Sequence, residues 1–168
     1  MITAIPNLSI FLIFRETAEK NTEVLFTKEG KGAGYARNIG LSHARGKWII
    51  FADADDFFTA NCFTILNEYM DSPHKVIYFN VRFVMSDDPS QESRRGTYYT
   101  NFFNDVNPEN KLRYQSQVPW GKMIRRSFLS TFHIQFDETR IANDVYFSCL
   151  VGIYAPKVTT DRRIIYYC

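Results

Sequence analysis

The alternation of apolar and polar residues along this 168-residue chain predicts an α/β domain. Three short apolar runs in the first third are bounded by polar residues or glycines, as buried strands are: Leu8–Phe14, Glu23–Thr27 and Lys47–Ala52. Between the last two runs, a glycine cluster at residues 30–34 opens a predicted helix, and Gly46 ends it. Strands and helices that alternate in this way indicate a mostly parallel sheet flanked by helices.

The pattern becomes less regular in the rest of the chain. Val76–Met85 alternates apolar with polar residues and predicts a strand with one packed face, and Asp161–Cys168 predicts a further strand. Helices are expected in three places: after Thr59 or Asn61, at Arg126–Thr131 and at Asn143–Tyr154. Residues 86–117 are polar, with periodicity only near Gly96–Phe103, so we expect a long loop there.

Composition and charge narrow the class of protein. A hydrophobic fraction of 45% and an aromatic fraction of 16% are those of a folded chain, and a net charge of +2 gives no sign of nucleic-acid binding. The three cysteines are odd in number and widely spaced, which argues against a disulfide framework or a zinc site. No segment resembles a bilayer span or a signal peptide. We therefore expect a cytoplasmic protein, with peripheral attachment to the inner membrane face left open.

Asp53, Asp55 and Asp56 form an acidic cluster directly after the third predicted strand. In open α/β sheets ligands bind where strands end, so these carboxylates are expected in a binding crevice. Two carboxylates separated by one residue can approach one hard divalent cation, which also binds phosphate oxygens. A solvated turn is the plain alternative. A calcium loop is excluded, because its glycine and glutamate positions hold Phe58 and Thr64.

The stretch GKGAGYARNIGLSHARGKWIIFADADD at residues 30–56 resembles the central signature of the family-2 glycosyltransferases of the GT-A fold. That signature contains a glycine turn, an Ala-Arg-Asn-x-Gly helix, an Ala-x-Gly stop and a strand ending in Asp-x-Asp. The matching positions keep the family's order and spacing: Gly32, Ala36, Arg37, Asn38, Gly40, Ala44, Gly46, Phe51, Asp53, Asp55 and Asp56. Downstream, PWGKMIRR at residues 119–126 resembles the family's W-x-K segment, and residues 136–145 resemble its F-x-E and E-D motifs.

The resemblance implies an inverting glycosyltransferase that moves a sugar from a nucleotide-diphosphate donor to an acceptor hydroxyl. Asp55, assisted by Asp53, would hold Mn²⁺ or Mg²⁺ on the donor diphosphate, and Arg37 would lie near the nucleotide. Asp144 would act as the general base on the acceptor hydroxyl. The residues expected on the acceptor side are Trp120, Lys122 and Asn143. By the same resemblance we expect a UDP-type donor, a glycan or lipid-linked acceptor, and a role in surface polysaccharide or glycoconjugate synthesis.

Plain structural explanations compete for several of these residues. Arg37 has a less favoured alternative as a solvent-facing charge on a helix, whereas Trp120 is equally compatible with ordinary core packing. The pair Asn143 and Asp144 matches a helix N-cap, which satisfies backbone N–H groups without any catalytic role. Asn143 also departs from the family's usual glutamate, so an amide stands where the family has a charge.

The start of the chain departs further from the family pattern. Either residues 2–6 form the first strand before a large deletion, or Leu8–Phe14 is the second strand and the first is absent; we favour the second alignment. Only Glu16 then stands where the family has its nucleoside-binding acids. A missing inner strand would expose sheet surface, which favours self-association.

We therefore expect a single GT-A-like domain over residues 1–168 that is N-terminally truncated. Residues 8–56 would form an incomplete nucleotide and metal half, and residues 57–168 an acceptor half. Such a chain is expected to bind donor poorly or to be a fragment of a longer enzyme. The rival classes are a non-catalytic remnant that keeps the sheet, and a sugar-nucleotide pyrophosphorylase, which is disfavoured because no glycine-rich phosphate loop follows the first strand.

Overall fold

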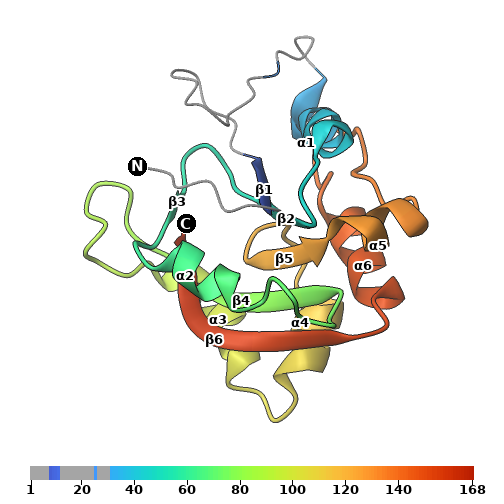
Figure 1. Cartoon of the computed structure of the whole chain (residues 1–168). Coiled ribbons are helices and arrows are strands. Elements are labelled where there is room, and N and C mark those ends of the chain that lie inside the picture. The colour runs from blue at the N-terminus through green and yellow to red at the C-terminus, as the bar shows by residue number, and fades with distance from the viewer. Residues whose placement is uncertain (1–7, 12–24, 26–30) are drawn as a thin grey trace.

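The computed structural model describes residues 8–11, 25 and 31–168, and its strands form one curled sheet (Figure 1). The strands are β1 (Leu8–Phe11), β2 (Trp48–Phe51), β3 (Phe57–Phe58), β4 (Val76–Arg82), β5 (Lys122–Arg125) and β6 (Val158–Tyr167). Their order across the sheet is β1-β2-β5-β4-β6-β3. The strand predicted at Glu23–Thr27 lies outside the described residues apart from Leu25, which belongs to no helix or strand.

The sheet is mixed, which corrects the expectation of a mostly parallel one. β1 pairs parallel with β2 and β4 parallel with β6, whereas the pairings β2–β5, β4–β5 and β3–β6 are antiparallel. β5 lies between β2 and β4 and runs against both. The periodicity of a sequence reports which faces of a strand are buried and not its direction, so this reversal leaves no trace in the pattern. The α/β class itself is confirmed.

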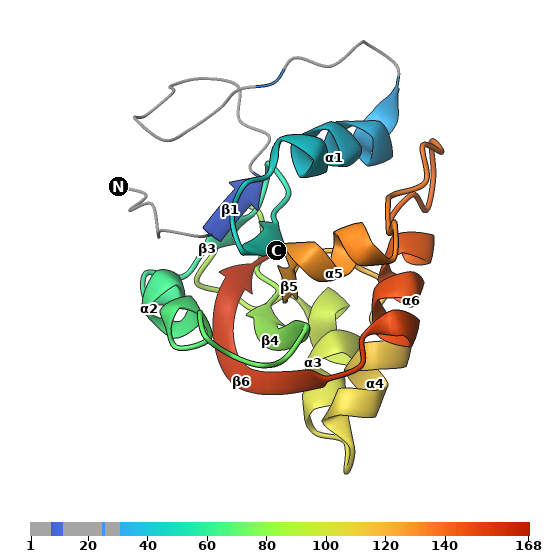
Figure 2. The ribbon, with the colours of Figure 1, turned by 45° about the vertical axis from the view of Figure 1, so that its right-hand side comes forward.

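Six α-helices and one short 3₁₀ helix flank the described sheet (Figures 1 and 2). They are α1 (Gly32–His43), α2 (Cys62–Asn67), η1 (Arg94–Gly96), α3 (Thr97–Phe103), α4 (Pro108–Gln115), α5 (Arg126–Thr131) and α6 (Val145–Tyr154). α1 lies at the β1–β2 end of the sheet, and α3 and α4 lie at the β4–β6 end (Figure 2). The helix predicted at Arg126–Thr131 has the predicted bounds, and α6 begins two residues after its predicted start.

The expectation of a long loop over residues 86–117 was wrong, since this segment contains η1, α3 and α4. α3 is short and buries only Tyr99 and Phe103, too few apolar positions for a clear helical period. α4 begins with a local signal, because the Asn107 side chain accepts a hydrogen bond from the Asn110 N–H at 3.2 Å. Pro108 follows at the first helical position, where its missing N–H costs nothing.

The core has two layers, one on each face of the sheet. On one face the Trp48 indole donates a hydrogen bond to the Met70 carbonyl beyond α2, and Phe79 meets Tyr69 edge to face. On the other face Phe51 packs edge to face against Phe147 of α6, with ring centroids 5.4 Å apart. All four residues of β2 are buried, so the end of this strand is held from both sides.

The strand directions bring three chain segments to one edge of the sheet. β2 and β4 each run antiparallel to β5, and β6 runs parallel to β4. The residues that follow β2, β4 and β6 therefore lie along the same edge. That edge carries the acidic cluster after β2, which makes it the candidate binding crevice.

Candidate functional site

Asp53 leads the acidic cluster at the carboxyl end of β2, and its backbone is fixed by a distant strand. The Asp53 N–H donates a hydrogen bond to the Tyr166 hydroxyl of β6 at 2.7 Å. The Asp53 side chain is 32% exposed, and Asp55 is exposed. One carboxylate is thus held against the protein and the other faces outward.

Arg37 of α1 joins this acidic cluster to the segment before α6. Its Nη2 lies 2.6 Å from Asp53 Oδ1, and its Nη1 donates to Asn143 Oδ1 at 2.9 Å. The Arg37 side chain is only 11% exposed. A planar guanidinium that bridges two acceptors fixes both of them, so Asp53 and Asn143 are tied into one unit. The interpretation of Arg37 as a solvent-facing helix charge is therefore wrong.

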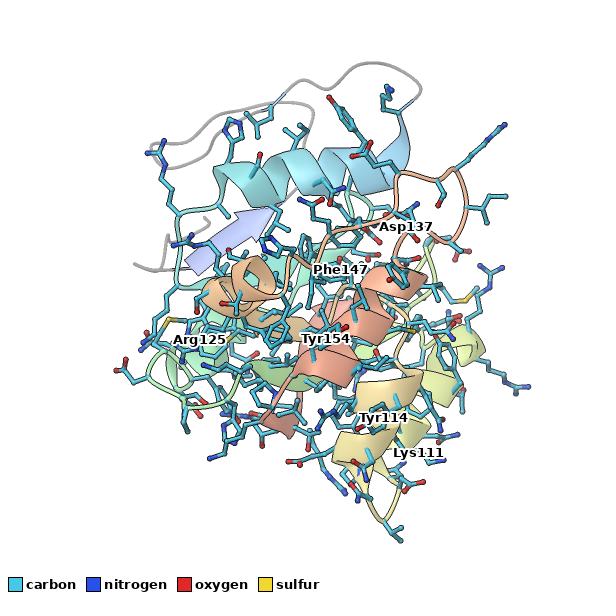
Figure 3. All side chains as sticks on the ribbon, turned by 90° about the vertical axis from the view of Figure 1, so that its right-hand side faces the viewer. Lys111, Tyr114, Arg125, Asp137, Phe147 and Tyr154 are labelled. Atoms are coloured by element: carbon cyan, nitrogen blue, oxygen red, sulfur yellow. The ribbon has the colours of Figure 1, made fainter. Side chains whose placement is uncertain are left out.

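The neighbouring residues of α1 hold the same segment against the helix. The Asn38 side chain forms two hydrogen bonds with the Phe136 backbone. Its Oδ1 accepts from the Phe136 N–H at 2.8 Å, and its Nδ2 donates to the Phe136 carbonyl at 2.9 Å. A Cβ atom at Gly34 would lie 2.0 Å from the Asp137 carbonyl oxygen, so only glycine allows this approach. Figure 3 shows Asp137 beside the first half of α1. The glycine therefore serves close packing of α1 on the α5–α6 connection.

Asp144 follows the bridged Asn143 and stands at the N-cap position of α6. Its backbone carbonyl accepts the first bonds of the helix, from the Ser148 N–H at 2.9 Å. Within the described part of the chain its carboxylate makes no capping hydrogen bond. Ala142 lies two residues before Asp144 and has a φ of 57°. This left-handed conformation costs a non-glycine residue about 1–2 kcal/mol. The N-cap explanation accounts for the position of Asp144 and not for its carboxylate.

Asp56 is the residue of the cluster whose acidity the fold changes most clearly. Burial raises the pKa of Asp56 to about 6, and the nearby charges of Asp53 and Asp55 add to that rise. Hydrogen bonds from Tyr166 and Cys168 oppose it. Sequence reasoning missed these last two residues, because the run DRRIIYYC indicates only a strand and not which edge it reaches.

The two residues of the W-x-K segment lie in the core and not on an open acceptor surface. Trp120 is 8% exposed and packs against Tyr166, with ring centroids 6.3 Å apart, so it supports the site from behind. Lys122 is wholly buried, and its Nζ donates to the Ser116 carbonyl at 2.9 Å. Burial lowers the pKa of Lys122 to about 7.

The acidic cluster suits a divalent cation that is shared with a ligand. Among the described residues no group of three or more His, Cys, Asp or Glu side chains could hold a metal by itself. Carboxylate oxygens are nevertheless the ligands that Mg²⁺ and Mn²⁺ prefer, and Mg²⁺ is often bound through one or two carboxylates plus substrate phosphates. Asp53 and Asp55 fit that incomplete kind of ligand set.

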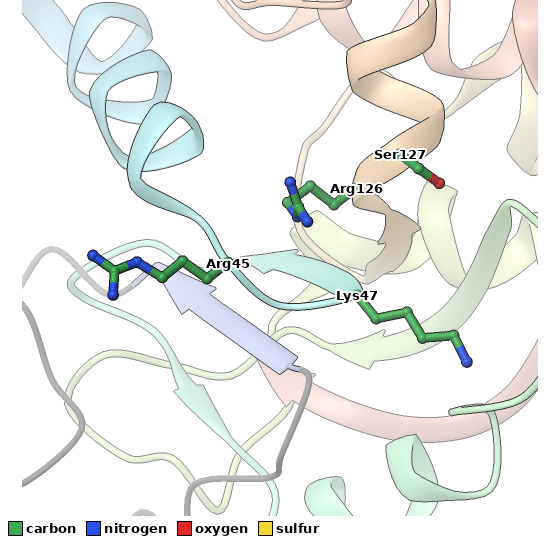
Figure 4. A pocket seen from close by; sticks show the side chains of 4 residues that line it. All are labelled: Arg45, Lys47, Arg126 and Ser127. Atoms are coloured by element: carbon green, nitrogen blue, oxygen red, sulfur yellow. The ribbon is translucent and has the colours of Figure 1, made fainter.

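A basic hollow of about 300 Å³ lies away from this acidic crevice. Its lining residues are Arg45, Lys47, Arg126 and Ser127 (Figure 4). Lys47 precedes β2, whereas Asp53 follows it, so the hollow is at the opposite edge of the sheet.

The sequence is similar to one known protein family and to curated members of it. The family model described as Glycosyl transferase family 2 matches residues 13–132. The putative glycosyltransferase EpsH of Bacillus subtilis is 27% identical over 153 residues, which cover 83% of this chain and 42% of that protein. Glycosyltransferase GlyA of Streptococcus pneumoniae is 22% identical over 92% of this chain and 23% of its own length.

A solved structure shares the fold. The chain superposes on the S. aureus TarS fragment 1–349 in complex with UDP-GlcNAc with a TM-score of 0.67 and 21% sequence identity. The match covers 87% of this chain and 41% of that one. The chain thus spans less than half the length of the curated relatives and of this structure.

Proposed function

Because the family model matches most of its length, this chain belongs to glycosyltransferase family 2, and we propose that it transfers a sugar from a nucleotide-diphosphate donor to an acceptor hydroxyl with inversion. The observation that carries the proposal is the Arg37 bridge between Asp53 and Asn143. It joins the acidic end of β2, suited to a metal-bound diphosphate, with the residue preceding a carboxylate suited to proton abstraction. This bridge supports the proposal because it ties the two segments to one edge of the sheet.

In the proposed reaction Asp144 is the general base. The acceptor hydroxyl attacks the anomeric carbon from the face opposite the diphosphate, and its proton passes to the Asp144 carboxylate. The bond between the anomeric carbon and the diphosphate oxygen breaks, and the nucleoside diphosphate leaves with that electron pair. A single displacement of this kind inverts the anomeric configuration.

Asp53 and Asp55 bind the donor side. They would hold a divalent cation, which when bound neutralises the diphosphate and the charge that develops on it as it leaves. Arg37 keeps Asp53 in place and adds positive charge near the same phosphates. Asn143 orients Arg37 from the other side as a neutral acceptor, where the family's glutamate would offset the positive charge of Arg37.

The donor is proposed to be UDP-linked, because the structurally similar TarS fragment has been solved with UDP-GlcNAc and with UDP. The proposed acceptor is a glycan or a lipid-linked glycan, and the proposed role is the synthesis of a surface polysaccharide or glycoconjugate. No helix among residues 31–168 is both long and apolar enough to cross a bilayer. Within this proposal residues 8–56 form the donor half and residues 57–168 the acceptor half.

Isothermal titration calorimetry of this chain with UDP, with and without Mn²⁺, tests the donor side. We expect weak binding that requires the metal and is lost in Asp55→Asn. Asp71→Asn removes an exposed carboxylate from the opposite edge of the sheet and is expected to leave binding unchanged. Equal binding with and without Mn²⁺, or no binding at all, would favour the rival interpretation of a non-catalytic domain that keeps the sheet.

A further inference from the structure

A polar hollow of about 310 Å³ lies between the end of β4 and α3, apart from the residues given roles above. Five of its lining residues carry neutral amide or hydroxyl side chains: Asn80, Ser93, Thr97, Thr100 and Asn101. Most of them come from the segment in which we had expected only a loop. The hollow is therefore a product of the folding of η1 and α3 against the sheet.

Two local features of the backbone shape the walls of this hollow. β6 bulges opposite β4, so that Phe79 pairs with Asp161 but the next residue, Asn80, pairs with Ile164. Bulges of this kind bend a strand, and they are common beside functional sites. On the other side, a Cβ atom at Gly96 would lie 1.7 Å from the Phe83 ring, so only glycine lets the start of α3 close against this wall.

The charge of the hollow is close to zero. Among the described residues, Arg82 and Glu92 are its only charged lining residues, and they form an ion pair with each other at 2.9 Å. The remaining polar groups both donate and accept hydrogen bonds. Asn80 Oδ1 accepts from the Val81 N–H at 3.0 Å, and no hydrogen bond to another described residue uses its Nδ2. Such a lining suits a ligand with many hydroxyl groups and no charge, and it does not suit a phosphate.

A row of aromatic rings connects the hollow to the proposed site. Phe83 in the wall of the hollow meets Trp120 at 5.6 Å, and Trp120 stacks on Tyr166, whose hydroxyl accepts from the Asp53 N–H. Tyr98 packs against Phe83 at 6.5 Å and is 52% exposed. Burial raises the pKa of Tyr98. Tyr98 therefore extends the aromatic row from Phe83, in the wall of the hollow, to the protein surface.

We propose that this hollow binds a neutral sugar unit of the acceptor, with the exposed Tyr98 ring, which packs on Phe83 in the wall of the hollow, as an aromatic platform. The proposal rests on the function proposed above and deepens it, because it selects an uncharged saccharide over an anionic one. Amide and hydroxyl side chains hydrogen-bond the sugar hydroxyls, while the C–H face of a pyranose packs against an aromatic ring. Asn101 and Thr100 of α3 are its specificity-determining residues.

Nuclear magnetic resonance of the ¹⁵N-labelled chain tests the proposal directly. The probes are the methyl glycosides of glucose, galactose and N-acetylglucosamine, with methyl glucuronide as an anionic comparator. We expect at least one neutral glycoside to shift the side-chain amide signals of Asn80 and Asn101, and methyl glucuronide to shift them less. Asn101→Ala should weaken this binding roughly five-fold. Asn104→Ala, at the C-cap of the same helix and outside the hollow, should not.

The proposal is overturned if no neutral glycoside shifts these amide signals at about 50 mM, where a millimolar site would be filled. Equal dissociation constants for wild type and Asn101→Ala would overturn it as well. Failure of the proposed function has a different signature, because UDP would then fail to bind with Mn²⁺ in the calorimetric titration. UDP binding without any glycoside shift would keep the transferase proposal and place the acceptor sugar elsewhere.

Discussion

At the scale of single residues, one guanidinium does most to define the site. Arg37 is nearly buried, and its two nitrogens are engaged by Asp53 and Asn143, which lie 16 and 106 residues away in the sequence. An isolated buried charge is costly, whereas a charge with two well-placed acceptors is stabilising. The motif match indicated a donor-side arginine, but no local pattern could indicate its second partner. Asn143 is therefore best understood as the acceptor that completes this bridge.

Removing the bridge should cost stability as well as activity. Arg37→Ala leaves Asp53 and Asn143 without their partner, and we expect the free energy of unfolding to fall by about 2 kcal/mol. Urea unfolding monitored by circular dichroism measures this loss. The control is Lys47→Ala, which breaks an exposed ion pair with Asp71 and should cost no more than about 1 kcal/mol. Equal losses in the two variants would show that the Arg37 bridge is no stronger than a surface pair.

Lys122 should make stability depend on pH. Burial lowers its pKa to about 7 in the folded chain, whereas an unfolded lysine titrates near 10.4. Between these values the unfolded state binds more protons, so the free energy of unfolding rises with pH by about 1 kcal/mol per unit from this group. Urea titrations at pH 7 and pH 8.5 should show that rise in the wild type and in the exposed-site control Lys31→Met. They should show it reduced in Lys122→Met; an unchanged rise would contradict the account.

At the scale of elements, the sequence indicated the parts that carry strong local patterns. β2, β4, β6, α1, α5 and α6 follow from apolar runs and helix stops, and the acidic cluster follows from the end of β2. The direction of β5 and the helices α3 and α4 did not follow, because short elements hold too few periods and direction has no period at all. The edge reached by Tyr166 depends on pairing across the whole sheet. The second ligand of Arg37 and the lining of the polar hollow were unpredictable for the same reason.

The contact between α1 and the α5–α6 connection should be sensitive to one methyl group. Gly34→Ala would place a Cβ atom against the Asp137 carbonyl, so the connection that carries Asn143 and Asp144 must shift. We expect a loss of about 1–3 kcal/mol in the free energy of unfolding, as for other overpacked positions. Ala33→Ser, on the exposed side of α1, should change it by less than about 0.5 kcal/mol. A Gly34→Ala variant as stable as the wild type would mean that the close packing is not needed.

At the scale of the whole molecule, different parts of the sheet carry different sites. One edge carries the acidic crevice and the neighbouring neutral hollow, and the opposite edge carries the basic hollow. β1 is the outermost strand on one side of the sheet, and among the described strands it pairs with β2 alone. A strand with one open side can pair with another chain. The self-association expected from the sequence therefore remains a prediction with a specific site.

Sedimentation velocity over a range of protein concentrations checks this prediction. We expect the weight-average sedimentation coefficient to rise with concentration as dimers form through β1. A coefficient that stays at the monomer value at every concentration would contradict it. The family membership and the Arg37 bridge do not depend on the outcome, because neither involves β1.

Asp144, which follows the Asn143 end of the Arg37 bridge, is proposed to abstract the proton from the acceptor hydroxyl. The most direct test is the rate of UDP release from a UDP-sugar by Asp144→Asn, with the dissociation constant of the donor measured on the same protein. We expect the rate to fall by about 10²–10⁴, the usual contribution of a general base, while donor affinity stays the same. Turnover close to the wild-type rate in Asp144→Asn would remove this residue from the mechanism and contradict the account.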